Sequence, residues 1–168
     1  MRKAYIIILV IVASALAACD NDIVFYHYEP APLAGWEKTD SIIFGVPHME
    51  KAGTYSMELG LRTTSGFPFK SVCLVVDRKL FSKNALNKYF LSESKSDTLI
   101  CRLTKEDGTV EGSGLNFYHY EMPLHLDCAV EAGDSLCFSV RHNMKRSILP
   151  GIADVGIMMR ESSGPALP

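Results

Sequence analysis

Thr54-Tyr-Ser-Met-Glu-Leu-Gly-Leu-Arg62 is a stretch in which apolar and polar residues alternate. Tyr55, Met57, Leu59 and Leu61 fall on one side of an extended chain, and the residues between them fall on the other. A repeat of two residues is the pattern of a β-strand with one buried face. We therefore expect a strand that covers a hydrophobic core with one face and meets water with the other.

The same alternation recurs in short runs along the rest of the chain. The runs predict strands at Ile23–Tyr28, Ser41–Val46, Thr54–Arg62, Ser71–Leu80, Thr98–Thr104, Leu115–Met122, Ser135–His142 and Ala153–Arg160. Turn-forming pairs such as Asp107-Gly108, Ala132-Gly133 and Pro150-Gly151 lie between them. This pattern predicts an all-β fold of about eight strands, an antiparallel β-sandwich or a jelly-roll-like arrangement. Residues 82–95 have a composition that favours a short helical or loop insertion.

The N-terminus has the pattern of a lipoprotein signal peptide. Arg2 and Lys3 supply a positive start, and the apolar run that follows is too short to cross roughly 30 Å of hydrocarbon. Leu16-Ala-Ala-Cys19 then places a cysteine after two small residues, where its thiol can form a thioether to a diacylglyceryl group. The alternative is an ordinary secretory signal with a cysteine at the cleavage site. We expect lipid attachment at Cys19.

This processing divides the chain into four parts. Residues 1–18 are the removed signal peptide, 19–22 a lipidated tether, 23–161 a single domain and 162–168 a flexible C-terminal tail. A mature chain of this length is in the usual range of one domain. The two acyl chains of the lipid are enough for stable anchoring. We expect the protein in the cell envelope, where its N-terminal lipid anchors it to a membrane.

The charge balance argues against nucleic acid as a partner. Loss of Arg2 and Lys3 lowers the basic residues from 17 to 15 against 19 acidic residues, which leaves a net charge of −4. Binding to a phosphate backbone needs a basic face, and the sequence has no run of Lys and Arg longer than a pair such as Lys145-Arg146.

Residues with catalytic or metal-binding chemistry are scattered along the chain. His119 and His125 belong to one run of alternating residues and would lie about 20 Å apart, too far to share a metal ion. Gly112-Ser-Gly114 lacks the spacing of a nucleophile elbow. We expect no catalytic residue, no metal site and no cofactor, and therefore a protein that is not an enzyme.

Four cysteines remain beside the one that would carry the lipid: Cys73, Cys101, Cys128 and Cys137. A turn at Ala132-Gly133 would place Cys128 and Cys137 opposite each other across a hairpin, where a disulfide could close. Buried thiols that act as small apolar residues are the alternative. Both interpretations stay open.

The stretch from Ile148 to Glu161 is the most specific part of the chain. Leu149 to Gly156 closely resembles the Leu-Pro-Gly-Ile-x-Asp-Val-Gly closing motif of the GldH family of lipoproteins. Further similarities are the cysteine motif, the aromatic strand after it, Gly35-Trp36, Asp40-Ser41, the Leu-x-Leu-Arg strand Leu59–Arg62 and the loop Gly66-Phe-Pro-Phe69. The chain departs from the family pattern at Leu80–Lys95, which is longer and more polar.

The resemblance implies an outer-membrane lipoprotein, facing the periplasm, that works with the gliding motility and type IX secretion machinery. It implies protein partners in the cell envelope, no known catalytic activity or cofactor, and no active-site residues. A carbohydrate-binding or glycan-handling lipoprotein is the alternative. Its support would come from the aromatic residues Tyr26, Tyr28, Trp36, Phe67, Phe69, Tyr118 and Tyr120. Trp36 is either an anchor for a partner or sugar, or a packing residue at the edge of the core.

Three short motifs match the Asp-Ser/Thr-aliphatic pattern of O-glycosylation in periplasmic proteins of bacteria that resemble those carrying this family. They place the candidate hydroxyls at Ser41, Thr98 and Ser135, each expected where a turn meets a strand. Asp and Ser are also ordinary turn residues, so the motifs have a purely structural interpretation as well.

Overall fold

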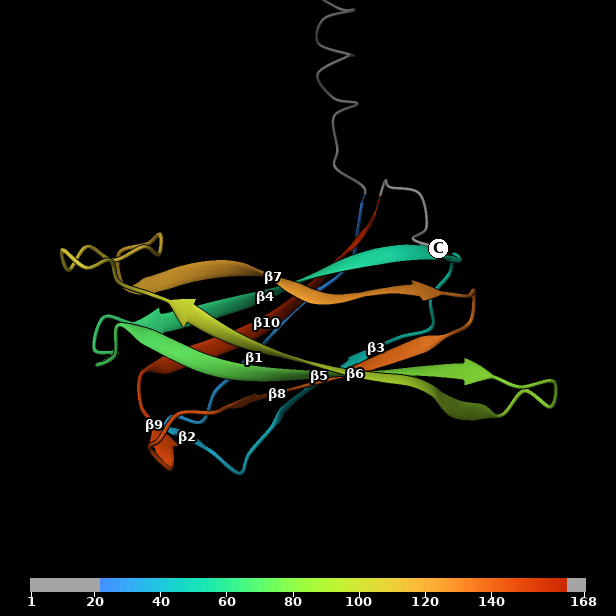
Figure 1. Ribbon diagram of the computed structural model, residues 1–168, viewed down its shortest axis with the longest axis horizontal. Coiled ribbons are helices and arrows are strands. Elements are labelled where there is room, and N and C mark those ends of the chain that lie inside the picture. Colours follow the sequence, from blue (N-terminus) through green and yellow to red (C-terminus); the bar gives the residue numbers. More distant parts are fainter. Residues whose placement is uncertain (1–21, 163–168) are drawn as a thin grey trace, which may run out of the picture.

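The computed structural model describes residues 22–162 (Figure 1). This part of the chain holds ten strands and no helix, so it has no helix with the length and hydropathy needed to cross a bilayer. The eight longer strands are β1 (Ile23–Pro30), β3 (Ile42–Val46), β4 (Gly53–Thr64), β5 (Ser71–Lys83), β6 (Tyr89–Arg102), β7 (Phe117–Val130), β8 (Ser135–His142) and β10 (Ile152–Glu161). Each overlaps one of the strands expected from alternation. The two short strands are β2 (Trp36–Glu37) and β9 (Ile148–Leu149).

The strands form two four-stranded antiparallel sheets that pack face to face. The first sheet has the order β1-β10-β4-β7, and the second has the order β3-β8-β5-β6. The short strands β2 and β9 pair with each other at one end. In Figure 1, β4 and β7 lie in the upper layer, and β5 and β8 lie in the lower one. The all-β sandwich predicted from the sequence is confirmed.

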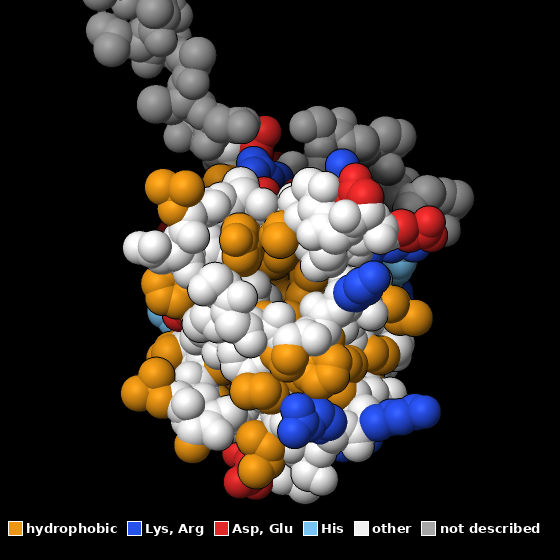
Figure 2. Space-filling model, turned by 90° about the vertical axis from the view of Figure 1, so that its left-hand side faces the viewer, with side chains coloured by type: hydrophobic (Ala, Val, Ile, Leu, Met, Phe, Trp, Pro, Cys, Tyr) orange, Lys and Arg blue, Asp and Glu red, His pale blue; other side chains and the backbone are white. Residues whose placement is uncertain are grey.

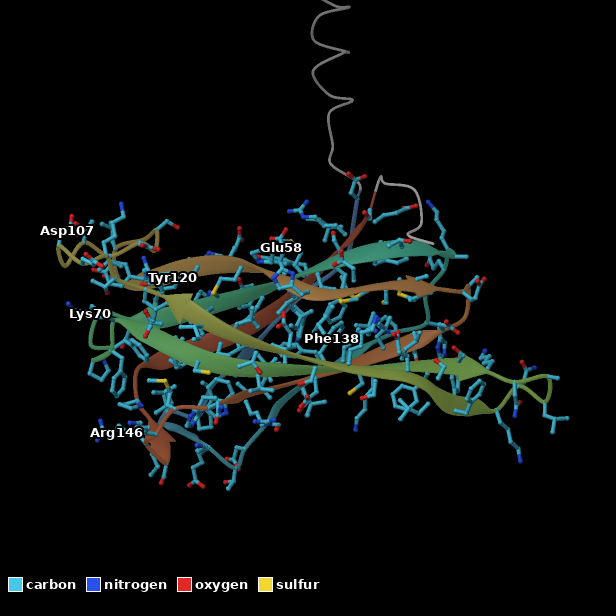
Figure 3. All side chains as sticks on the ribbon, in the orientation of Figure 1. Glu58, Lys70, Asp107, Tyr120, Phe138 and Arg146 are labelled. Carbon is cyan, nitrogen blue, oxygen red and sulfur yellow. The ribbon has the colours of Figure 1, made fainter. Side chains whose placement is uncertain are left out.

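The core lies between the two sheets. Tyr55, Met57, Leu59 and Leu61 of β4 are at most 1% exposed, so the alternation of this strand is confirmed. Phe138 of β8 faces them from the second sheet and lies between the layers in Figure 3. Burial of each such side chain stabilises the fold by about 1.5–3 kcal/mol relative to an exposed one.

Trp36 is a core residue. Its side chain is fully buried, and its indole N–H donates a hydrogen bond to the carbonyl oxygen of Asp40. The ring lies edge-on against the imidazole of His142, which is also buried. Of the two interpretations of this tryptophan, packing is therefore correct, and the side chain is unavailable to a partner or sugar.

The segment 82–95 differs from the expected insertion because it is neither helix nor loop. β5 and β6 continue as a paired hairpin up to Lys83 and Tyr89, and only a short turn joins them. The composition of Asn84 to Leu91 suits a helical turn. The residues on either side of the short turn nevertheless pair with each other as strands. In Figure 1 this hairpin projects beyond the rest of the sandwich at the right.

Candidate functional site

The predicted lipid attachment at Cys19 lies outside the described residues, as do the signal peptide and almost all of the C-terminal tail. The first described residue is Asp22, directly before β1. Lipid attachment therefore stays a prediction from the sequence motif.

The prediction that Cys128 and Cys137 lie opposite each other in a hairpin is wrong. Cys128 belongs to β7 of the first sheet and is buried, whereas Cys137 belongs to β8 of the second sheet and pairs with Gly45. The turn at Gly133 passes from one sheet to the other, so the two cysteines are not cross-strand partners. Both are free thiols, as are Cys73 and Cys101.

The three candidate glycosylation hydroxyls lie in different settings. Ser41 is exposed directly before β3, and Ser135 is half-buried at the start of β8, as expected for turn-to-strand positions. Thr98 is exposed, but it lies in the middle of β6 opposite Val75, so its expected place at a turn is wrong. Modification of any of the three stays a prediction.

Side chains that could hold a metal ion do not gather in the described part of the chain. His119 and His125 both belong to β7, the single strand that the spacing argument assumed. Among residues 22–162, no group of three or more His, Cys, Asp or Glu side chains is arranged to hold a metal ion.

The most organised surface is the outer face of the first sheet. Tyr28 of β1 pairs with Gly156 of β10, Gly156 pairs with Gly60 of β4, and Gly60 pairs with Glu121 of β7. Two glycines therefore lie side by side in the middle of the sheet. They leave a trough across β10 and β4, because neither strand carries a side chain there.

The side chain of Tyr28 fills this trough. A Cβ atom on Gly156 would lie 2.7 Å from the tyrosine ring, and one on Gly60 would overlap the hydroxyl group. The hydroxyl oxygen lies 2.5 Å from Nε2 of His119 on β7, so the tyrosine spans the sheet from one edge to the other. Burial of the ring raises the pKa of the Tyr28 hydroxyl, which therefore stays protonated and can donate to His119.

Charged residues frame the tyrosine. The guanidinium carbon of Arg62 lies 4.6 Å from the centre of the Tyr28 ring, a cation–π contact. Oδ2 of Asp154 lies 3.3 Å from Nε of Arg62, and Arg62 lies opposite His119 in the strand register. Tyr26 packs edge-on against Tyr28 and is half exposed.

A second ion pair joins Glu58 and Arg160 across β4 and β10 at 3.8 Å. Figure 3 shows Glu58 on the outside of the upper layer, away from the core. We call the whole set the Tyr28 face; it comprises Tyr26, Tyr28, Glu58, Gly60, Arg62, His119, Glu121, Asp154, Gly156 and Arg160.

The Tyr28 face is a surface and not a pocket. The recess beside Tyr28, lined by Tyr26, Glu58 and Met158 among others, has no room for a water molecule. Next to the face, an open hollow of about 800 Å³ is lined by Pro32, Leu33, Phe117 and Asp154. Leu33 is fully exposed and Phe117 half exposed.

Figure 2 looks onto this end of the sandwich, where hydrophobic side chains gather and Lys and Arg side chains border them. Exposed apolar area of this kind, next to aromatic and paired charged residues, is typical of protein–protein interfaces.

Other aromatic residues of interest do not add to this surface. Tyr120 is buried, and Tyr118, Phe67 and Phe69 pack against the core. Tyr26 and Tyr28 meet at an interplanar angle of 82°, which does not make a flat platform for stacking a sugar ring.

The fold and its outer face define a small antiparallel β-sandwich with an exposed aromatic and charged surface. The family model described as GldH lipoprotein matches residues 23–159. The chain therefore belongs to the GldH lipoprotein family, whose members are lipoproteins of the cell envelope associated with gliding motility.

A curated relative is the "Gliding motility lipoprotein GldH" of Flavobacterium johnsoniae, which is 29% identical over 107 residues. The alignment covers 64% of this chain and 61% of that relative, so the chain spans less than two thirds of the relative's length.

Solved structures give weaker likenesses. A crystal structure from Sulfurospirillum deleyianum has a TM-score of 0.48 at 10% identity and covers 83% of this chain and 99% of that one. The Yersinia pseudotuberculosis-derived mitogen has a TM-score of 0.34 at 3% identity, with 84% and 87% covered. Scores this low carry no structural argument, so the family assignment rests on sequence.

Several segments that carry the family resemblance meet on the Tyr28 face. Tyr26 and Tyr28 come from the aromatic strand, Arg62 from the Leu-x-Leu-Arg strand, and Asp154 and Gly156 from the closing motif. Sequence reasoning treated these segments separately and missed the site. The available signal was a glycine inside each of two strands, which indicates close approach of another group.

Proposed function

We propose that this protein is a noncatalytic, lipid-anchored component of the gliding motility and type IX secretion machinery. The diacylglyceryl group on Cys19 holds it at the outer membrane, facing the periplasm. The sandwich then binds an envelope protein through the Tyr28 face and the adjoining apolar hollow.

One observation carries this proposal. Residues that are far apart in the chain, in the segments that resemble the family, come together on a single exposed face without a cavity. A buried core needs no such arrangement on its outside, and a small-molecule site needs an enclosed recess. A flat surface with rigid, mutually paired side chains suits a protein partner.

The composition of this surface supports the same proposal. Half-exposed Tyr26 and Phe117 offer aromatic anchors, which carry much of the energy in protein interfaces. The ion pairs Arg62–Asp154 and Glu58–Arg160 place charged groups of both signs beside these anchors, as in the polar rim of a protein interface.

Site-specific cross-linking in the native host tests the docking surface. A photoreactive amino acid replaces Tyr26 on the proposed face or, as the matched control, Ile100, which is exposed on β6 in the second sheet. We expect adducts with gliding or secretion components from position 26 and none from position 100. The same adducts from both positions, or from neither, would contradict the proposed surface.

A separate experiment tests the anchor. Cys19→Ser removes the only sulfur of the motif, so the product should leave the membrane fraction and lose the mass of the lipid. Unchanged membrane partition would contradict the lipid anchor without bearing on the Tyr28 face.

A further inference from the structure

The end of the β5–β6 hairpin has an unusual composition for this acidic protein. Residues 79–91, which we call the hairpin tip, contain Lys79, Lys83 and Lys88 and no acidic residue. The same short segment carries Leu86, Phe90 and Leu91. Basic and large apolar side chains together are typical of segments that lie in a membrane interface.

The apolar side chains of the hairpin tip are exposed to solvent. Leu86 is 78% exposed, and Phe90 and Leu91 are each about half exposed. Leu86 belongs to the turn, and Phe90 and Leu91 follow it in β6. The end of this hairpin projects past the sandwich (Figure 1). The sandwich core therefore does not bury these side chains.

The turn at the end of the hairpin is well organised. Oδ1 of Asn84 accepts hydrogen bonds from the backbone N–H groups of Leu86 and Lys88, at 2.9 and 3.0 Å. Asn87 adopts a φ of 58°, a left-handed conformation that asparagine tolerates. The turn thus holds Leu86 outward in a defined conformation.

Tyr89, the first residue after the hairpin turn, contacts the end of the sandwich where β1 begins. The hydroxyl of Tyr89 lies 2.7 Å from Nδ1 of His48 and also donates to the carbonyl oxygen of Gly133 at 3.2 Å. The segment that holds His48 also lines a hollow with Ile23 and Val24, the first residues of β1. The hairpin and the start of the domain therefore flank the same segment.

The tether length brings this end of the molecule to the membrane. Asp22 follows Cys19 by three residues. The first strand begins one residue later, at Ile23, and an extended chain spans at most about 3.6 Å per residue, so this strand begins within about 14 Å of the lipidated residue. With so short a tether, surfaces near the start of β1 face the headgroups.

We propose that the hairpin tip is a second membrane contact, which inserts Leu86, Phe90 and Leu91 into the interface of the bilayer that holds the lipid anchor. Lys83 and Lys88 lie beside these side chains and pair with anionic phospholipid headgroups. The contact rests on the proposed lipid anchor, and it fixes the orientation of the sandwich, so that the Tyr28 face is presented to a partner at a constant height.

Tryptophan fluorescence tests the contact in the lipidated mature chain. Leu86→Trp places a reporter at the tip, and Leu115→Trp is the matched control, because Leu115 is 93% exposed before β7 at the other end of the sandwich. Native Trp36 is fully buried and contributes a constant background. The proteins are reconstituted in vesicles of phosphatidylethanolamine and phosphatidylglycerol with brominated acyl chains, which quench tryptophan on contact.

We expect the Leu86→Trp reporter to be quenched at least twofold more than the Leu115→Trp reporter. The double substitution Lys83→Glu with Lys88→Glu should reduce the quenching of the Leu86→Trp reporter. Loss of each lysine alone weakens the contact of the tip with anionic lipids by about fivefold. Equal quenching of the two reporters in protein that sediments with the vesicles would overturn the hairpin contact and leave the anchor intact. Wild-type protein that does not sediment would overturn the anchor and this inference with it.

Discussion

The hydroxyl of Tyr28 lies 2.5 Å from Nε2 of His119, although the two residues belong to opposite edge strands of the first sheet. A tyrosine can reach that far only because β10 and β4 carry Gly156 and Gly60 along its path. The contact ties β1, the first strand of the domain, to β7 across the whole width of the sheet.

Gly60→Ala should displace Tyr28 without unfolding the sandwich. The new Cβ would overlap the tyrosine hydroxyl, which lies at the end of a side chain that can swing out. Loss of the hydrogen bond to His119 and of the contact with Arg62 should lower the free energy of unfolding by about 1–2 kcal/mol. Urea denaturation followed by Trp36 fluorescence measures the change.

The control for this substitution is the same change in a Tyr28→Ala background. Without the tyrosine ring there is nothing to displace, and alanine in a strand is better than glycine by about 0.5–1 kcal/mol. Gly60→Ala should then be neutral or stabilising. A cost of similar size in both backgrounds would show that Gly60 is needed for another reason.

Glu93→Gln should destabilise the protein more than Arg78→Met. Arg78 is fully buried, and its guanidinium donates to Oε2 of Glu93 at 2.6 Å. Removal of the carboxylate leaves a buried positive charge, which costs about 3–5 kcal/mol in fully buried pairs and less here, because Glu93 is partly exposed. A methionine of similar size removes the charge itself and should cost little.

The matched control for this pair is Lys95→Gln. Lys95 also binds Glu93, at 3.0 Å, but it lies at the surface. Its removal should change the free energy of unfolding by less than about 1 kcal/mol. If Arg78→Met is the most costly of the three substitutions, the buried charge is stabilising and the interpretation is wrong.

Local patterns predicted the strands well, because alternating burial is a property of each strand by itself. Thr54–Arg62 and Ser135–His142 were found almost to the residue for this reason. The hairpin at 82–95 was not, because Asn84–Leu91 has no alternation, and the residues on either side of its turn become strands by pairing with each other.

The Tyr28 face and the separation of Cys128 from Cys137 could not be predicted from local sequence, because both depend on which strands pair in the sheets. The turn at Gly133 looks like a hairpin turn, yet it joins strands of different sheets, and no local residue encodes that choice. Gly60 and Gly156 signalled a close approach, but Tyr28 covers them only because β1 pairs with β10 in one register. Such pairing is decided by the burial of both strands together and not by either one alone.

The mature protein should contain four reactive thiols and no disulfide. Alkylation in denaturant without a reductant should add four labels, at Cys73, Cys101, Cys128 and Cys137, as counted by intact mass. In the folded protein Cys101 should react slowest, because burial raises its pKa to about 12 and leaves almost no thiolate. Two labels in place of four would show that a disulfide forms.

His142 should make the protein less stable as the pH falls below about 6.5. Its imidazole is buried, and burial holds its pKa below the ordinary value of 6.5. In the neutral form Nε2–H donates to the carbonyl oxygen of Trp36 at 3.0 Å, and Nδ1 accepts from the backbone N–H of Met144 at 3.4 Å. A proton on Nδ1 would break the second bond, so the folded state resists protonation.

The sign of the effect follows from proton binding. Below pH 6.5 the unfolded chain protonates this histidine while the folded protein does not, so acid favours unfolding by at most about 1.4 kcal/mol per pH unit. The contribution is complete above pH 6.5 and is lost between there and the lower folded pKa. His142→Gln keeps a donor and an acceptor and should flatten the urea stability curve between about pH 7.5 and pH 5. His125→Gln, on the exposed side of β7, should leave the slope as it is in the wild type, and an equal flattening in both variants would contradict the assignment.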